Sequence, residues 1–347
     1  METPAMEARK LLKLDANEGR CVLDASQLAR LLTPQVACRY PKAAAIEAVL
    51  AEKYGVDPVC ILATAGADDA IDRAFRSLAG QDSLIVSTVP GFVEFLDASA
   101  RTKAMFIGVP KIPGTVFPLE AFQSIIQRQK PAIAVVATPD NPDGTTLSTA
   151  EFLSIAETCS RCGTVFLLDV TYIDFADDRS IVNLAIDTPG VLLTGSFSKS
   201  RGLAGFRAGW TIAGPASPGL IGRLRAAGPP FSLSSPAIEA VRMALQECEP
   251  VYLDFIDRIR FERQKLLDVL TNTNARAWPS QANFVSAFVP DSEAFVATLA
   301  REGILVRHWS GKPETNGLVR ITCPGEKEGF EALVASIENM EELIWPQ

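Results

Sequence analysis

The segment SFSKSRGLAGFRAGW, residues 196–210, follows an apolar run at residues 191–194 that predicts a β-strand. Open α/β sheets bind ligands beyond the carboxyl ends of their strands, which is where Lys199 falls. A lysine held near other cations, such as Arg201, loses its proton more readily and can form a Schiff base. Serine hydroxyls and a guanidinium can bind a phosphate group. The plain alternative is an exposed lysine in a loop rich in serine and glycine.

Short apolar runs alternate with helical patterns on the amino-terminal side of this segment. The uniformly apolar runs predict strands that are buried on both faces of a sheet. Repeated strand–helix–strand units predict an α/β fold with a mainly parallel central sheet flanked by helices. The expected strands are residues 59–63, 83–87, 104–107, 132–137, 165–169 and 191–194, and the expected helices are residues 67–78, 93–99, 119–129 and 149–160.

The pattern changes near residue 251, where a long helix is expected at residues 251–272. Three separate short strands and two helices follow, which predicts a smaller α+β domain at the carboxyl end. The strands are expected at residues 283–288, 304–307 and 318–322, and the helices at residues 292–301 and 327–343. We therefore divide the chain into a large domain, residues 40–250, and a small domain, residues 251–347.

Composition excludes several classes of protein. The 347 residues are 48% hydrophobic and 21% charged, which is typical of a folded chain and not of a disordered one. The net charge of −8 argues against a nucleic-acid partner. No apolar run is long enough to cross a membrane, and the charged amino terminus does not resemble a signal peptide. Seven scattered cysteines and one histidine favour a reduced, cytoplasmic protein without a metal site.

A carboxylate ends the expected strand in VFLLDVTY, residues 165–172. A buried Asp169 is costly unless a cationic group meets it, and a protonated pyridine nitrogen is such a group. Tyr172, three residues further on, would reach the phenolic oxygen of the same ring. The alternative is that Asp169 caps the amino end of a helix.

Two more segments follow expected strands. In ATPDNPDG, residues 137–144, the amide of Asn141 would donate to the same ring oxygen, although such a sequence also forms simple turns. In TAGADD, residues 64–69, the small residues Gly66 and Ala67 and then Asp68 lead into a helix, whose free N–H groups form an anion site.

These segments together resemble the pyridoxal-phosphate enzymes of fold type I, and within them the histidinol-phosphate aminotransferase family. The resemblance covers nearly the whole chain, and the order and spacing of the segments make it specific. Further matches are LDANE at residues 14–18, RYP at 39–41, PGF at 90–92 and LVRIT at 318–322.

The resemblance implies a role for each matched residue. Lys199 would hold pyridoxal phosphate as an aldimine and move the proton at the substrate α-carbon, while Asp169 keeps the ring nitrogen protonated. Asn141 and Tyr172 would bind the phenolic oxygen, and Phe92 would stack on the ring. Residues of the same subunit would bind the cofactor phosphate: Gly66, Ala67, Asp68, Ser196, Ser198 and Arg207. Tyr40 would reach that phosphate from the neighbouring subunit. The substrate would be bound by Arg320 at its carboxylate and by Arg307 and Asn17 at its other end.

The resemblance also implies a homodimer with shared active sites, in which an arm, residues 1–39, packs on the small domain and on the neighbouring subunit. The implied activity is a ping-pong aminotransferase of amino-acid biosynthesis that acts on an amino donor and a 2-oxo acid. Histidinol phosphate and 2-oxoglutarate are the expected pair. Three alternatives stay open: an aromatic amino acid aminotransferase, a lyase of the threonine-phosphate decarboxylase type, and a non-catalytic protein that binds pyridoxal phosphate.

This sequence departs from the family pattern at several positions. Phe92 replaces a tyrosine, and Gly19 replaces an asparagine. Asp140 and Asp143 replace an asparagine and a threonine, and we expect them to place additional acid next to the ring. Residues 170–171 are Val-Thr instead of Glu-Ala. None of these changes affects the lysine, aspartate or arginine that the chemistry needs.

Overall fold

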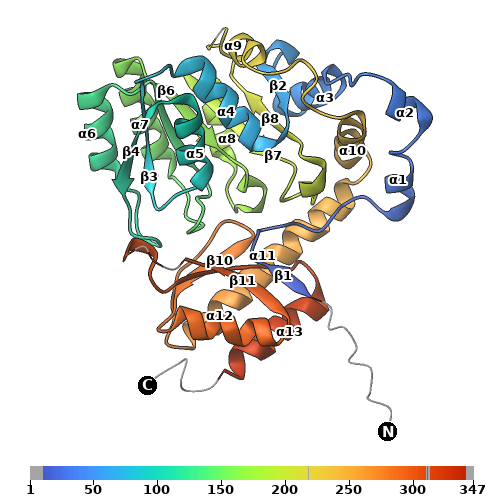
Figure 1. The fold of residues 1–347 in the computed structure, drawn as a ribbon, viewed down its shortest axis with the longest axis vertical. Coiled ribbons are helices and arrows are strands. Elements are labelled where there is room, and N and C mark those ends of the chain that lie inside the picture. Colours follow the sequence, from blue (N-terminus) through green and yellow to red (C-terminus); the bar gives the residue numbers. More distant parts are fainter. Residues whose placement is uncertain (1–10, 218, 310, 312, 341–347) are drawn as a thin grey trace.

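A computed structural model describes residues 11–217, 219–309, 311 and 313–340. Its upper part in Figure 1 is a seven-stranded sheet in which β8 alone runs antiparallel to its neighbours. The mainly parallel α/β sheet predicted from the sequence is confirmed. In spatial order the strands are β2 (Ile61–Thr64), β8 (Gly209–Ile212), β7 (Val191–Ser196), β6 (Val165–Asp169), β5 (Ile133–Ala137), β3 (Leu84–Val89) and β4 (Met105–Pro110).

Helices cover both faces of this sheet, which explains why its strands are apolar throughout. Along β5, Ile133 and Val135 pack on one face, while Ala134 and Val136 pack on the other. Burial of every side chain removes the alternation that a half-exposed strand would show. One face is covered by α4 (Gly66–Leu78), α5 (Val93–Thr102) and α9 (Leu220–Ala226), and the other by α6 (Leu119–Gln129), α7 (Thr149–Cys162), α8 (Ser180–Asp187) and α10 (Ser235–Gln246).

The lower part of Figure 1 is a five-stranded sheet with the order β1-β11-β12-β10-β9. The long helix α11 (Glu249–Thr271) runs from the upper part into it, and α12 (Ser292–Arg301) and α13 (Lys327–Glu338) complete it. This agrees with the expected α+β unit, although the division at residue 250 stays a prediction. The strands are β1 (Leu12–Leu14), β9 (Arg276–Ala277), β10 (Phe284–Phe288), β11 (Ile304–His308) and β12 (Leu318–Thr322).

Three strands were not expected from the sequence: β1, β8 and the two-residue β9. β1 has only three residues and pairs in parallel with β11, almost 300 positions later in the chain. β8 begins at Gly209, near the end of the serine- and glycine-rich segment at residues 196–210, for which no strand was expected. The expected strand at 59–63 began two residues too early, because Asp57 caps a 3₁₀ turn at Pro58–Cys60. The expected helix at 327–343 ends earlier than predicted, at Glu338, and its last three positions lie outside the described residues, as does the arm before residue 11.

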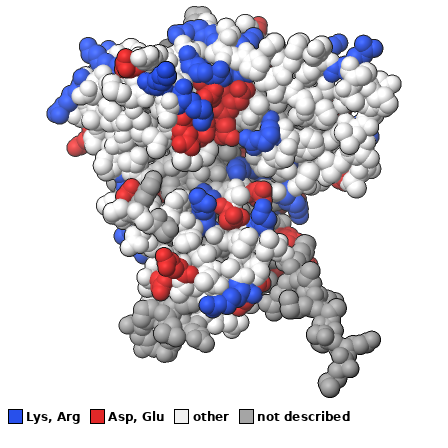
Figure 2. Space-filling view, viewed as in Figure 1, with Lys and Arg blue, Asp and Glu red and all other residues white. Residues whose placement is uncertain are grey.

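The helices between β1 and β2 are α1 (Ala25–Ala29), α2 (Pro34–Cys38) and α3 (Ala44–Tyr54). Within the described residues, no helix combines the length and the apolarity that crossing a bilayer requires. Figure 2 shows acidic side chains gathered above the hollow between the two parts, with basic side chains beside them. Among the charged residues of α4 and α5, Arg101 pairs with both Asp72 and Glu94. The face in view therefore carries both signs of charge.

Candidate active site

A cavity of about 910 Å³ lies between the carboxyl edge of the large sheet and the small sheet. The ends of the adjacent strands β5, β6 and β7 contribute Ala137, Asp169 and Ser196 to its wall. Parallel strands bring their carboxyl ends to one edge, which is why motifs far apart in the sequence meet here. Of the predicted site residues, the cavity is lined by Asn17, Ala67, Asp68, Phe92, Asn141, Asp169, Tyr172, Ser196, Ser198, Lys199, Arg207, Arg307 and Arg320, but not by Gly66 or Tyr40.

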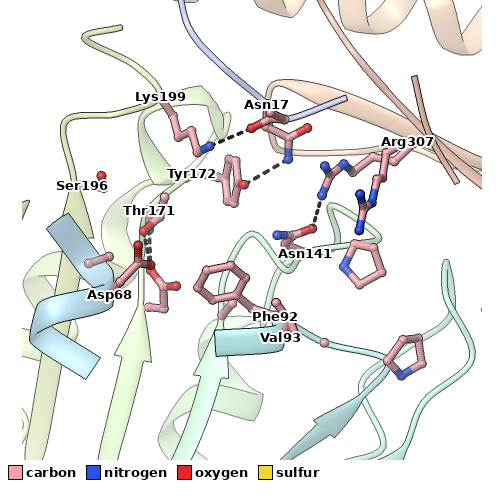
Figure 3. Close-up of a pocket in the computed structure, with 18 of the residues that line it drawn as sticks. Asn17, Asp68, Phe92, Val93, Asn141, Thr171, Tyr172, Ser196, Lys199 and Arg307 are labelled. Atoms are coloured by element: carbon pink, nitrogen blue, oxygen red, sulfur yellow. Dashed lines mark hydrogen bonds between the residues drawn. The ribbon is translucent and has the colours of Figure 1, made fainter. Parts of the chain in front are cut away.

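Lys199 extends into the cavity from the loop that follows β7 (Figure 3). Its Nζ donates to the carbonyl oxygen of Ala16 at 3.0 Å and lies 5.9 Å from the centre of the Tyr172 ring. The amine is thus held against the amino-terminal arm by a hydrogen bond that a covalent ligand can replace.

Asp169 is a buried carboxylate in the wall of the cavity, with 4% of its surface exposed. Its Oδ1 accepts hydrogen bonds from Thr171 N at 2.9 Å and Thr171 Oγ1 at 2.6 Å. Burial nevertheless raises the pKa of Asp169 to about 6. The residue does not cap a helix, because the 3₁₀ turn that follows, Ile173–Phe175, begins after Tyr172. A cation placed beside this carboxylate would lower its pKa again and favour the ionised form.

Hydroxyls, a guanidinium and a helix start form one end of the cavity. Ser196 Oγ and Ser198 Oγ are 2.9 Å apart, and Arg207 Nη2 is 2.7 Å from Asp68 Oδ2. Gly66 begins α4 with a positive φ of 87°, and a Cβ there would lie 3.0 Å from Arg207 Nη2. Free N–H groups at a helix start, together with a guanidinium, bind phosphate. This end therefore fits a phosphate group.

The opposite end of the cavity contains Arg320, which is buried with 7% exposed. Its Nη1 donates to Asn141 Oδ1 at 2.6 Å and its Nη2 to Asp15 O at 2.7 Å, while the buried Nε has no partner. Burial lowers the pKa of this guanidinium. Arg307 lies directly opposite on β11 and also lines the cavity. An anion that enters here meets two guanidinium groups.

Comparison with known proteins agrees with this geometry. The family model described as aminotransferase class I and II matches residues 15–337. The chain belongs to this family. It is 30% identical over 340 residues to the histidinol-phosphate aminotransferase of Chromobacterium violaceum, with 94% of this chain and 92% of the relative aligned.

Solved structures support the same fold. Histidinol-phosphate aminotransferase from Sinorhizobium meliloti, in complex with pyridoxal-5'-phosphate, superimposes with a TM-score of 0.83 at 22% identity, covering 96% of this chain and 92% of that one. The L-threonine-O-3-phosphate decarboxylase of Porphyromonas gingivalis gives a TM-score of 0.76 at 21% identity, covering 94% and 98%. The protein is a fold type I aminotransferase that depends on pyridoxal phosphate. Its amine, buried carboxylate and phosphate-binding end fit that cofactor.

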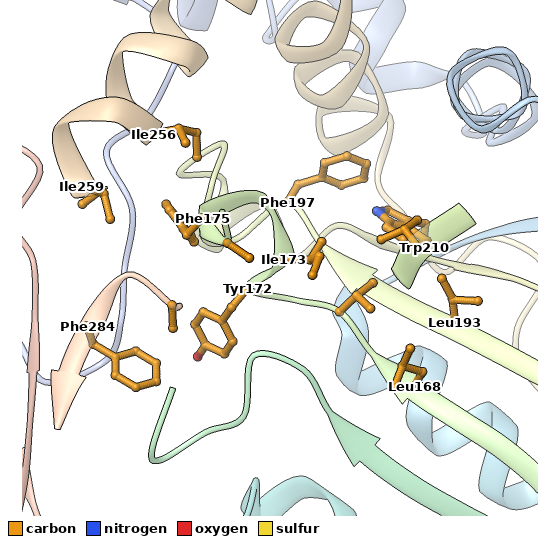
Figure 4. Close-up of a cluster of buried hydrophobic side chains, with 14 of the residues drawn as sticks. Leu168, Tyr172, Ile173, Phe175, Leu193, Phe197, Trp210, Ile256, Ile259 and Phe284 are labelled. Atoms are coloured by element: carbon orange, nitrogen blue, oxygen red, sulfur yellow. The ribbon is translucent and has the colours of Figure 1, made fainter. Parts of the chain in front are cut away.

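In this aminotransferase, Asn17 bridges the two parts of the molecule. Its Nδ2 donates to Tyr172 Oη at 3.0 Å, and its Oδ1 accepts from Thr322 Oγ1 at 2.9 Å. The ring of Tyr172 packs edge-on against Phe284, with centroids 5.4 Å apart, at the border of the core shown in Figure 4. Asn17 is 1% exposed and adopts a positive φ of 53°. Its side chain is thus already committed to Tyr172 and the small sheet, whereas the sequence suggested a direct role in substrate binding.

A steric constraint explains why position 19 is a glycine. A Cβ on Gly19 would lie 1.8 Å from the carbonyl oxygen of Lys199, so the arm crosses directly over the lysine loop. Val22 N also donates to Arg201 O at 3.3 Å. Any larger residue at position 19 would separate the arm from the loop that carries the amine.

The expectation that Asp140 and Asp143 add acid next to the ring is wrong. Neither residue lines the cavity, and both carboxylates lie 2.8 Å from Lys111 Nζ. A buried lysine attracts the nearest carboxylates, because an unpaired ion in the interior is costly. Sequence reasoning missed Lys111, although two acids in one turn at the end of a buried strand required a cation nearby. It also missed Asp15 and Trp309 in the cavity wall.

Two predicted residues lie apart from the cavity wall. Gly66 lies beneath Arg207. Tyr40 is 78% exposed and stacks on Phe231, with ring centroids 4.7 Å apart. Its expected contact with the phosphate of a neighbouring subunit stays a prediction.

Phe92 lines the cavity at the start of α5 and contacts Phe95 edge-on at 5.6 Å. Within the described part of the chain, no cluster of His, Cys, Asp or Glu could hold a metal ion. Burial raises the pKa of the Cys159 thiol to about 12, which makes it a poor nucleophile.

Proposed function

We propose that this aminotransferase exchanges an amino group between histidinol phosphate and 2-oxoglutarate, giving imidazole acetol phosphate and glutamate in a ping-pong reaction. The single observation that carries the proposal is the convergence of Lys199, Asp169 and Arg320 on one cavity with a phosphate-binding end. The names of relatives with about 30% identity support the choice of substrate.

We assign the reacting centre to Lys199 and Asp169. Pyridoxal phosphate supplies an electron sink for the charge that develops at the substrate α-carbon. Lys199 would hold the cofactor covalently and would carry the proton to and from the α-carbon, a task that its position near Tyr172 allows. Asp169 would pair with the ring nitrogen and keep it protonated, which would compensate the carboxylate for its burial.

Asn141 and Tyr172 would bind the phenolic oxygen of the cofactor. Arg320 can only donate hydrogen bonds, so the oxygen of the Asn141 amide is occupied and its NH₂ group remains available. Tyr172 Oη likewise accepts from Asn17, which leaves its own proton to donate. The Asn141 amide and the Tyr172 hydroxyl are thus both able to donate to the phenolic oxygen. Phe92 would stack on the ring, and the phosphate would be bound by Gly66, Ala67, Asp68, Ser196, Ser198 and Arg207.

The substrates differ in where they carry negative charge. Glutamate presents carboxylates, whereas histidinol phosphate presents a phosphate and has no carboxylate. Arg320 and Arg307, opposite each other on β12 and β11, can receive either anion. Asn17 would then act indirectly, through Tyr172.

We also propose that the enzyme is a cytoplasmic homodimer of amino-acid biosynthesis. The exposed Tyr40, stacked on Phe231, would complete the phosphate site of the neighbouring subunit. The free cysteines of the described residues are compatible with a reduced compartment. Sedimentation of the purified chain tests the dimer, and a monomer with full activity would contradict it.

Absorbance spectroscopy tests the reaction. Purified protein with pyridoxal phosphate should show a visible band that is absent in Lys199→Ala. Histidinol phosphate should shift the band, and 2-oxoglutarate should restore it. A shift with phenylalanine or tyrosine only would indicate an aromatic aminotransferase. Release of carbon dioxide from threonine phosphate without an oxo acid would indicate a decarboxylase, and no response to any donor would indicate a non-catalytic protein.

A further inference from the structure

A buried lysine and two carboxylates form a charged cluster beside the active site. Lys111 Nζ lies 2.8 Å from Asp140 Oδ2, 2.8 Å from Asp143 Oδ2 and 2.9 Å from Thr145 Oγ1. The side chains of Lys111, Asp140 and Asp143 are only 4%, 8% and 2% exposed. All three donors of the ammonium group therefore have partners in the interior.

The cluster fixes the backbone of the turn at residues 140–145. Asp140 Oδ1 accepts from the backbone N–H of Asn141 at 2.8 Å, and Asp143 Oδ1 accepts from that of Thr145 at 2.9 Å. Gly114 N donates to Asp143 Oδ2 at 3.2 Å. Each carboxylate thus links the lysine to the turn itself. Although burial alone would lower the pKa of Lys111, the two carboxylates raise it, so the lysine stays charged.

The same turn carries Asn141 into the cavity. Asp140 and Asp143 flank it and point away from the cavity, while Asn141 lines the cavity and accepts from Arg320 at 2.6 Å. The small-sheet side holds the turn as well. Ser286 Oγ donates to Pro142 O at 2.6 Å, and Trp278 Nε1 donates to Asp143 O at 2.8 Å. The residues before and after Asn141 in the chain are therefore both held by buried contacts.

We propose that Lys111 is a positioning residue that, through Asp140 and Asp143, fixes the turn so that Asn141 faces both the cofactor ring and Arg320. This inference rests on the proposed function, because the ring contact of Asn141 is assigned there. The cluster replaces the Asn and Thr that the family pattern has at positions 140 and 143. In this chain, a buried ionic contact does the positioning.

A double-mutant cycle tests the proposal. Lys111→Met, Asn141→Ala and the double variant are compared by the dissociation constant of pyridoxal phosphate, measured by absorbance titration, and by kcat and KM for the amino donor. If Lys111 acts through Asn141, Lys111→Met should weaken cofactor binding about tenfold in the wild-type background and less than about twofold in the Asn141→Ala background. The same factor in both backgrounds would overturn the proposal, because a purely structural role does not depend on Asn141.

A second variant covers a failure of Lys111→Met to fold, since that change leaves two carboxylates buried without a cation. The neutral triple variant, Lys111→Met with Asp140→Ala and Asp143→Ala, removes the buried charges without introducing the family's Asn and Thr, and enters the same cycle with the same expectation. Wild-type cofactor affinity and rates in the triple variant would also overturn the proposal. Lys265→Met, on the exposed surface of α11, is the matched control and should change nothing.

The cofactor titration separates this inference from the proposed function. It needs no amino donor, so it tests Lys111 even if wild-type protein fails to react with histidinol phosphate. If no amino donor reacts but the effect of Lys111→Met depends on Asn141, the proposed substrate is rejected and the positioning role is kept. If the enzyme reacts with histidinol phosphate but Lys111→Met has the same effect with and without Asn141, the substrate is kept and the positioning role is rejected.

Discussion

The two ends of the active-site cavity are assembled in different ways. The phosphate end comes from turns at the edge of one sheet, where Ser196, Ser198 and Arg207 follow or precede adjacent strands. The substrate end joins three distant segments, because Arg320 of the small sheet binds Asn141 of the large sheet and Asp15 of the arm. The phosphate end therefore depends on the strand order of one sheet, which brings the start of α4 to Arg207, whereas the substrate end depends on how the two sheets and the arm pack together.

Asp169, on the floor between the two ends, gives the largest expected effect. Asp169→Asn removes the partner of the ring nitrogen, and kcat should fall roughly 10²- to 10³-fold. In cofactor-free protein, the same substitution should increase the free energy of unfolding. The folded-state pKa of about 6 lies above the ordinary value of 3.8, so this carboxylate destabilises the fold as pH rises between those values.

Denaturant unfolding checks this second effect. At pH 7.5, cofactor-free Asp169→Asn should be more stable than wild type by up to about 3 kcal/mol, and near pH 4 the difference should vanish. A less stable variant at pH 7.5 would show that Asp169 serves the fold and not the chemistry. The variant-to-wild-type difference at each pH isolates Asp169 from the buried Asp140, whose pKa is also about 6.

A matched pair of arginine variants separates the two ends directly. Arg320→Ala should raise KM for the substrates about 100-fold, because charge-assisted hydrogen bonds are lost, and should leave the cofactor dissociation constant within about threefold. Arg207→Ala should weaken cofactor binding and change KM little. Steady-state kinetics and absorbance titration of both variants provide the check. Equal effects of both variants on both quantities would mean that the ends do not act separately.

Gly19→Ala tests whether the arm belongs to the substrate end. The added Cβ would meet the Lys199 carbonyl oxygen at 1.8 Å, so the arm must move and take Ala16 and Asn17 with it. We expect kcat/KM to fall at least about tenfold, with a smaller change in cofactor affinity. Gly222→Ala is the control, because a Cβ there meets no atom within 4 Å. Unchanged kinetics in Gly19→Ala would contradict the close crossing of arm and loop.

Tyr172→Phe should have the smallest effect. The ring still packs on Phe284, and only the hydroxyl is lost, which accepts from Asn17 and, in the proposed mechanism, donates to the phenolic oxygen of the cofactor. Because Asn141 remains as the second donor to that oxygen, we expect a drop of about five- to tenfold in kcat/KM. The measurement is steady-state kinetics at constant cofactor saturation. A drop beyond 100-fold would instead give Tyr172 a direct part in proton transfer.

Much of the large-sheet side of the cavity was predictable from the sequence. The apolar runs identified β5, β6 and β7, and the polar motifs directly after them placed Asn141, Asp169 and Lys199 at one sheet edge. This works because the end of a buried strand is a local feature, and parallel pairing brings such ends together. The departure at Gly19 was visible in the sequence, but its steric cause was not.

The sequence by itself determined the fold class and placed Lys199 and Asp169, the proposed reactive lysine and ring-nitrogen partner, beside one cavity, because each depends on residue type and on position at the end of a strand. Only the tertiary structure decided which partners these and other groups have. It bound Asp140 and Asp143 to Lys111, Asn17 to Tyr172, and the three-residue β1 to β11. Partners separated by 29 to 305 positions leave no periodic signal, and a buried charge is neutralised by whichever opposite charge the packing brings within reach.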